Sequence, residues 1–425
     1  MFFTERNIMK TIFLVILTFS SSVLFAQQAD SLLLPQLVAE VKEANYKLKA
    51  SRSSVHAANA RIGQATMWEA PQVSVALMDN PLTSFNPLNG MEREYAITQM
   101  IPFPGKNSSF QSAAKANSEF YENLFRAEER TIVAETKKQF VMIYSAQRRI
   151  EVNIENQELA KQMIASVRSK YSVGMASQAD VLRLEIELSK LQNQRATLEH
   201  DLLVPEAMLN TLRAKPISTP IARIPEIHLS GFSFNKDQLV AQALVNRSEL
   251  AAMKNDVAMS DAELSMVQRE RFPDIMISAL YRERVGMMPD SWEVMAGISI
   301  PIAPWVSGKI GGRIEENEFK LQRSEALVSD METMIRFEVL DTWIKAKAHW
   351  EQAERYRTNI IPAAQQTMDA LLAAYQTNKA DFLSLIDSFR MLQMYKMEYY
   401  MEIADYLMHR YDLERAVGME FETNF

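Results

Sequence analysis

The stretch APQVSVAL (Ala70–Leu77) is echoed about 200 residues later by FPDIMISAL (Phe272–Leu280). In both stretches a proline precedes an alternation of side chains that is typical of a β-strand. Two further echoes follow in the same order, QMIPFPGK (Gln99–Lys106) with SIPIAPWVSGK (Ser299–Lys309), and YSVGMASQADVL (Tyr171–Leu182) with YQTNKADFLSLI (Tyr375–Ile386). The chain is therefore duplicated, and each repeat is predicted to hold short helices, two strands and two very long helices.

Glycine and proline are almost absent after each pair of strands. Gly174 is the only residue of either type between positions 107 and 204, and none occurs in 313–361 or 363–417. Because these residues cost about 1 and about 3 kcal/mol inside a helix, the pattern predicts long helices over residues 107–170, 177–213, 309–374 and 380–417. The first would be about 96 Å long, so we expect an elongated molecule.

The strands are predicted at residues 72–78, 94–101, 274–281 and 292–300. Their lengths are close to those of tilted strands that cross a bilayer. A hairpin in a water-soluble protein would show the same alternation of side chains. The first repeat then covers 27–213, a linker with three prolines covers 214–236, the second repeat covers 237–420, and a tail covers 421–425.

The N-terminus has the order of a secretory signal peptide. Arg6 and Lys10 precede an apolar run, and small residues lead to Ala26, which predicts a cleaved segment over residues 1–26 with either Met1 or Met9 as initiator. The apolar run is shorter than the roughly 20 residues of a spanning helix. The chain has no cysteine, which excludes disulfides, thiolate metal sites and a lipid on an N-terminal cysteine.

Composition also excludes several function classes. The net charge is −7 and no basic patch stands out, which argues against nucleic acid as a partner. The five histidines lie far apart, and the chain carries no nucleotide-binding or nucleophile motif. We therefore expect no enzyme, no cofactor and no bound structural metal.

The number of strands predicts an assembly. If the strands cross a membrane, the sheet must close, because an open edge in lipid leaves backbone groups unpaired at several kcal/mol each. Four strands cannot close, since the smallest barrels have about eight. Two copies would give eight strands and three copies twelve, and only the larger barrel leaves a usable lumen. The long helices would continue the barrel as a helical tube.

At this point the chain resembles the TolC-like outer-membrane efflux proteins over nearly its whole mature length. The resemblance is carried by the doubled strand pairs, by PFPGK at Pro102–Lys106, and by the repeated segments that begin at Tyr171 and Tyr375. It implies a mainly α fold with a small β-barrel portion, which is a homotrimer with a twelve-stranded barrel in the outer membrane and an α-helical coiled-coil tunnel in the periplasm. It also implies passive export of substrates delivered by a periplasmic adaptor (membrane fusion) protein and an inner-membrane pump of the resistance-nodulation-division type.

The resemblance carries only a few site residues over to this chain. Tyr171, Gly174, Tyr375 and Asn378 would form the helix-tip turns at the periplasmic end. The family often has two acidic residues just after the second turn, and here those positions hold Ser384 and Asp387. Asp381 and Asp180 are nearby carboxylates. A threefold ring of Asp387 would attract cations at the entrance, whereas a solvated aspartate near a helix start is the alternative.

Two questions stay open from the sequence. PFPGK is common in members that work with heavy-metal pumps, so metal cations, organic compounds and secreted proteins (a type I secretion duct) are alternative cargoes. The 26 methionines could bind soft metal ions, but methionine also fills irregular cores. A periplasmic coiled-coil scaffold is the rival architecture, and it leaves the two matched hairpins unexplained.

Overall fold

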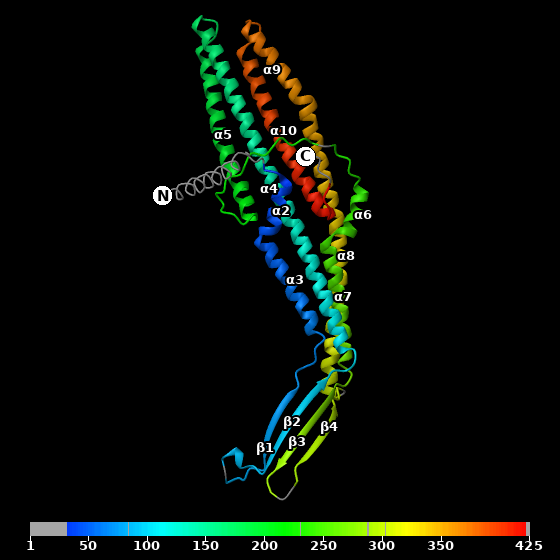
Figure 1. Ribbon diagram of the computed structural model, residues 1–425. Coiled ribbons are helices and arrows are strands. Elements are labelled where there is room, and N and C mark those ends of the chain that lie inside the picture. The colour runs from blue at the N-terminus through cyan, green and yellow to red at the C-terminus, as the bar shows by residue number, and fades with distance from the viewer. Residues whose placement is uncertain (1–31, 84, 230, 287–288, 302, 422–425) are drawn as a thin grey trace, which may run out of the picture.

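The protein is described by a computed structural model that covers residues 32–83, 85–229, 231–286, 289–301 and 303–421. Figure 1 shows an elongated molecule with a β-sheet at one end and two helix-pair tips at the other. The predicted signal peptide over residues 1–26 lies outside the described residues, as do residues 422–425 of the predicted tail, so both stay predictions.

The two repeats contribute equivalent elements. The helices of the first repeat are α2 (Leu34–Ala44), α3 (Tyr46–Gln64), α4 (Lys106–Ser172) and α5 (Gln178–Leu212). Those of the second are α6 (Lys236–Asn246), α7 (Ser248–Arg269), α8 (Pro304–Arg355), α9 (Ile361–Gln376) and α10 (Phe382–Val417). The strands are β1 (Gln72–Met78), β2 (Glu92–Ile101), β3 (Ile275–Arg284) and β4 (Ser291–Ile298), and a short 3₁₀ turn covers Pro87–Asn89. In the part of the chain that the structure describes, no helix is both long enough and apolar enough to cross a bilayer.

Helix α4 is the longest helix described, with 67 residues, and it packs against α3, α5, α7 and α10. Narrow apolar seams hold the helices together, as expected for coiled-coil packing. Near the tips one buried cluster joins α4, α5, α9 and α10, and it includes Val167, Leu184, Leu191, Tyr375 and Phe389. Burial of such side chains contributes about 1.5–3 kcal/mol each relative to exposure.

The second repeat differs from the single helix that the sequence predicts over residues 309–374. Helix α8 begins at Pro304, and a π-helical segment, Tyr356–Ile360, separates it from α9. Pro362 lies in the first turn of α9, and its missing N–H cannot continue the hydrogen bonds of α8. The wider π turn accommodates that loss and keeps the chain helical on both sides.

The PFPGK segment joins the sheet to α4. Asp274 accepts hydrogen bonds from the backbone N–H of Phe103 at 2.8 Å and from Lys106 Nζ at 2.7 Å. Gly105 has φ of 98°, and a Cβ at this position would meet the guanidinium of Arg269. The motif therefore connects the first repeat to the second where the strands end.

The segment between α5 and α6 runs along the middle of the helical body. Ile224 and Ile227 are buried in a core cluster with residues of α2, α4, α8 and α10. The hydroxyl of Tyr144 donates to Glu226 at 2.9 Å, and burial, followed by this carboxylate, raises the pKa of Tyr144. The predicted linker is thus packed against α4 and hydrogen-bonded to it.

Candidate functional site

The sheet has two chemically different faces. Its four strands form an antiparallel meander in the order β1-β2-β3-β4. Successive side chains on a strand point to opposite sides. We call one side the apolar face; its exposed members are Val73, Val75, Tyr95, Ile97, Ile275, Ile277, Tyr281, Trp292, Val294 and Ile298. The other side, the polar face, carries all of the charged lattice of the sheet and several small polar residues, with some apolar side chains among them; its members include Ser74, Ala76, Glu92, Glu94, Thr98, Ser278, Arg282, Arg284, Ser291 and Glu293, and also Met78, Ala96, Met100, Met276, Leu280 and Met295.

Aromatic side chains form a row on the apolar face. Tyr95 pairs with Tyr281, and Tyr281 pairs with Trp292 on the next strand. One pair further toward the loops, Arg93 lies opposite Glu283, with their charged atoms 3.6 Å apart. An apolar band that ends in aromatic residues and then in charges is the order found at a membrane–water interface.

The sheet is open at both edges within one chain. Among the residues that the structure describes, strand β1 pairs only with β2, and β4 pairs only with β3. Each outer edge therefore presents backbone groups that have no partner strand in the described residues. Such edges can be satisfied by a strand of another copy.

At the opposite end of the molecule, the two helix-tip turns have the same geometry. Gly174 has φ of 77° and Asn378 has φ of 60°, so both adopt the left-handed conformation that the turn requires. In the first turn, the N–H of Gly174 donates to the carbonyl of Tyr171 at 3.0 Å. In the second, Asn378 donates to Tyr375 at 3.1 Å. The second turn therefore has the same backbone conformation as the first, with asparagine in place of glycine.

Three of the residues predicted to lie at the entrance, Asp180, Asp381 and Ser384, take part in helix capping. Ser177 and Asp180 form a reciprocal capping box at the start of α5, with both bonds at 3.2 Å. At the equivalent start of α10 the residue types are exchanged, because Asp381 accepts from the N–H of Ser384 at 2.9 Å and from its hydroxyl at 2.7 Å. These bonds lower the pKa of Asp381. Asp180, Asp381 and Ser384 therefore fix the tip geometry.

Lys170 joins the two tips. Its ammonium group donates to the backbone carbonyl of Tyr375 and to Oδ1 of Asn378, and it lies 4.5 Å from the centre of the Tyr375 ring. The structure thus brings all four predicted turn residues to one end of the molecule, with Tyr171 and Gly174 on one hairpin and Tyr375 and Asn378 on the other. Sequence reasoning did not identify Lys170.

Asp387 lies one turn beyond the cap of α10, and its side chain is 66% exposed. It forms an ion pair with Arg390, whose Nη1 is 3.7 Å from Oδ1 of Asp387. Arg390 also donates to Glu187 of α5 at 2.8 and 3.1 Å, and the Glu187 side chain is only 9% exposed. Asp387 is therefore available to solvent, whereas Glu187 and Arg390 tie the two helix pairs together.

A hollow of about 430 Å³ lies beside Asp387 between α9 and α10. Its wall is mostly apolar, and it is lined by Ile360, Ala363, Ala364, Thr367, Leu371, Ser384, Asp387, Ser388, Met391 and Tyr395. The π-helical segment ends at Ile360, so the hollow begins where the helix changes its winding.

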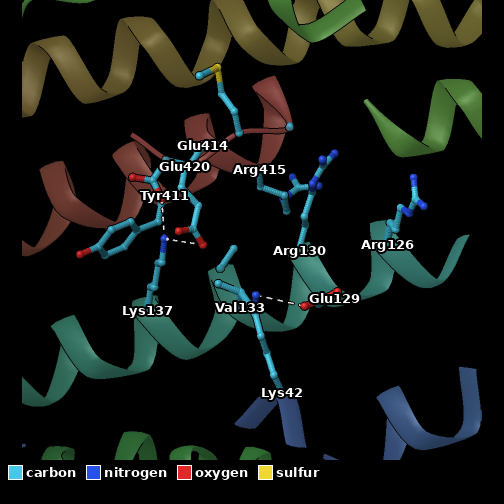
Figure 2. Close-up of a pocket in the computed structure, with 13 residues that line it drawn as sticks. Lys42, Arg126, Glu129, Arg130, Val133, Lys137, Tyr411, Glu414, Arg415 and Glu420 are labelled. Carbon is cyan, nitrogen blue, oxygen red and sulfur yellow. Dashed lines mark hydrogen bonds and ion pairs between the residues drawn. The ribbon is translucent and has the colours of Figure 1, made fainter. Parts of the chain in front are cut away.

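A second pocket, of about 280 Å³, lies in the middle of the helical body between α2, α4 and the end of α10 (Figure 2). Within it Lys137 contacts Glu414 at 2.7 Å and Glu420 at 3.6 Å, and Lys42 contacts Glu129 at 3.0 Å. Burial raises the pKa of Glu414 although Lys137 opposes the shift. These pairs fasten α10 and α2 to α4.

No group of three or more histidine, aspartate or glutamate side chains in the described residues is arranged to hold a metal ion. His349 and His409 stack with ring centres 5.3 Å apart, and His349 Nδ1 lies 2.8 Å from Glu402.

Residues 37–214 match the family described as outer membrane efflux protein. Nodulation protein T of Rhizobium leguminosarum bv. trifolii is 20% identical over 261 residues; this match covers 58% of the chain but only 54% of that relative's length. Among solved structures, the outer-membrane channel OprN gives a TM-score of 0.77 at 16% identity, covering 91% of this chain and 90% of that chain.

The outer membrane protein VceC from Vibrio cholerae gives the same TM-score at 14% identity, covering 92% of this chain and 97% of that one. These structural likenesses show a common fold over almost the whole described chain. With the family match over residues 37–214, they lead to one conclusion: the first repeat matches the outer membrane efflux protein family, and the chain shares its fold with the outer-membrane channel OprN over almost its whole length.

Proposed function

We propose that this protein is the outer-membrane exit channel of a tripartite efflux system. In this proposal it works passively, and substrates reach it from an inner-membrane pump through a periplasmic adaptor protein. The observation that carries the proposal is the combination of an open sheet with one apolar and one polar face and helical pairs that continue from the same strands.

Three copies would form the channel. Their sheets would close by pairing β4 of one copy with β1 of the next, which keeps the antiparallel alternation of the meander. The resulting twelve strands would turn the apolar face to lipid and the polar face to a water-filled lumen. The helices would form the periplasmic tunnel, with the tips at its entrance.

Asp387 is the proposed entrance residue. Because its carboxylate is exposed, three copies around the axis would place a ring of negative charge at the narrow end. Such a ring favours cationic cargo, including metal cations, while the pump selects the substrate.

A water-soluble periplasmic scaffold is less consistent with the sheet. Its apolar face presents at least ten exposed aliphatic and aromatic side chains in contiguous cross-strand rows. Soluble monomers rarely expose contiguous apolar patches of this kind.

The proposal is tested by recording single-channel currents of the detergent-purified protein in a planar lipid bilayer. We expect discrete openings with a preference for cations. A protein that stays in aqueous buffer without detergent and gives no current would contradict the proposal and favour the scaffold.

A further inference from the structure

We infer that Glu293 sets a second ion-selecting ring inside the barrel, at the loop end of the sheet and far from the tips. This inference rests on the proposed function, because it requires the polar face to line a lumen. It concerns a charge on β4 that the sequence does not single out.

The starting observation is a lattice of charges on the polar face. Arg282 contacts Glu92 through Nε and Glu94 through Nη2, both at 3.0 Å. Arg284 contacts the same Glu92 oxygen at 2.9 Å. The two arginines of β3 are thus ion-paired with two glutamates of the neighbouring strand β2. These four side chains neutralise one another and are fixed in place by their neighbours.

Glu293 is the fifth charge at this level, and it interacts with Arg282 only at longer range, through its charge. It lies opposite Leu280 in the β3–β4 register, its residue is exposed, and it makes no ion pair with a described residue. Three carboxylates against two guanidinium groups leave one net negative charge per chain on this part of the polar face.

Closure of the barrel would not neutralise that charge. Strand β4 is an edge strand, so its new neighbour would be β1 of the next copy. The polar-face side chains of β1 are Gln72, Ser74, Ala76 and Met78, and none of them is a cation. Each of three copies would therefore contribute one surplus negative charge to the lumen, carried by the exposed Glu293.

A ring of like charges in a narrow aqueous passage raises the local concentration of counter-ions. Here the ring would favour cations over anions at the outer end of the channel, in series with Asp387 at the other end. The two arginines do not offset it in full, because they face three carboxylates, and Arg282 interacts more strongly with Glu94 and Glu92 than with Glu293.

The test is the reversal potential of single channels in a KCl gradient, measured for the wild type, E293Q and E293K. We expect E293Q to weaken the preference for K⁺ over Cl⁻, and E293K to weaken it further. The matched control is E283Q, which removes a carboxylate near the same end of the sheet but on the apolar face, where Glu283 pairs with Arg93. E283Q should keep the wild-type reversal potential.

An unchanged reversal potential in E293K channels would overturn the inference while leaving the channel itself established. Equal shifts in E293Q and E283Q would also overturn it, because the effect would then not depend on the face. A wild-type protein that gives no channels would instead contradict the proposed function.

Discussion

Arg390 of α10 holds the buried carboxylate of Glu187 on α5 with two hydrogen bonds of 2.8 and 3.1 Å, across 203 residues of sequence. The same arginine lies 3.7 Å from Asp387. One side chain thus connects the two helix pairs at the tip and partly offsets the proposed entrance charge.

Replacing Arg390 with alanine should loosen the tip. Among the described residues Glu187 would keep one ion-pair partner, Lys190 at 3.6 Å. Because its carboxylate would then be poorly compensated, we expect the free energy of unfolding to fall by about 1–2 kcal/mol. We expect a larger single-channel conductance. R168A removes the exposed pair with Glu185 and is the matched control. Equal conductance of R390A and the wild type would show that this contact does not restrain the tip.

Removal of the Asp387 charge should have two effects. D387A should raise the conductance because it removes the ring that narrows the entrance, and it should lower cation selectivity because the negative potential is lost. D387E keeps the charge and should retain the selectivity. If D387A channels match the wild type in both conductance and selectivity, Asp387 is only a solvated helix residue.

The two faces of the sheet predict opposite responses to a new charge. Val294 on the apolar face and Met295 on the polar face are adjacent on β4 and are 60% and 44% exposed. V294K should impair assembly by about 2–4 kcal/mol if its side chain meets lipid, and lysines at Ile277 or Ile298 should do the same. M295K should assemble normally. Assembly is read from the yield of trimer in detergent, and a lower yield for M295K than for V294K would reverse the assignment of the faces.

Asn45 should matter more for stability than an ordinary helix cap. Its side chain accepts from the N–H groups of Lys47 and Leu48 and also donates to the carbonyl of Leu212 at 3.0 Å. We expect N45A to cost about 2 kcal/mol, because the helix cap is lost and the buried carbonyl of Leu212 loses its donor. Within the described part of the chain Asn235 caps α6 without such a long-range bond, so N235A should lower the melting temperature less. Equal losses would mean that the bond to Leu212 adds nothing.

His409 predicts a dependence of stability on pH. Burial and then the neighbouring His349 lower its pKa from the ordinary 6.5, while Asp412 and Asp405 oppose the shift and Lys345 adds to it. The unfolded chain therefore binds the proton more readily, and stability should fall as the pH drops below about 6.5 and be fully present above it. H409N should flatten the melting temperature between pH 5 and about 7, and H56N, at an exposed position, should not. An unchanged slope in H409N would exclude His409 as the source.

Much of the architecture follows from local sequence signals. The alternation after Pro71 and Pro273 predicts β1 and β3, and Gly174 marks the first tip turn because it supplies a left-handed residue. The absence of helix breakers predicts the long helices. These features can be predicted from the sequence because each depends on residues that are only a few positions apart in the chain.

The features that sequence reasoning missed depend on distant partners. Glu187 interrupts the leucine seam of α5, but its partner is 203 residues away and nothing nearby identifies it. The π-helical segment arises from the accommodation of Pro362 between two packed helices. Asp180 and Asp381 were predicted as entrance carboxylates, and the structure adds their capping bonds, which require the turn geometry.

Closure of the sheet between copies can be measured by disulfide cross-linking, because the chain has no native cysteine. Ser74 on β1 is replaced by cysteine and combined in turn with E293C, M295C or G297C on β4, since opposed strand residues lie within disulfide reach. We predict that at least one combination gives a ladder of cross-linked species that stops at three chains. Cross-linking only within single chains, a ladder beyond three, or no cross-link in any combination would contradict the trimeric barrel.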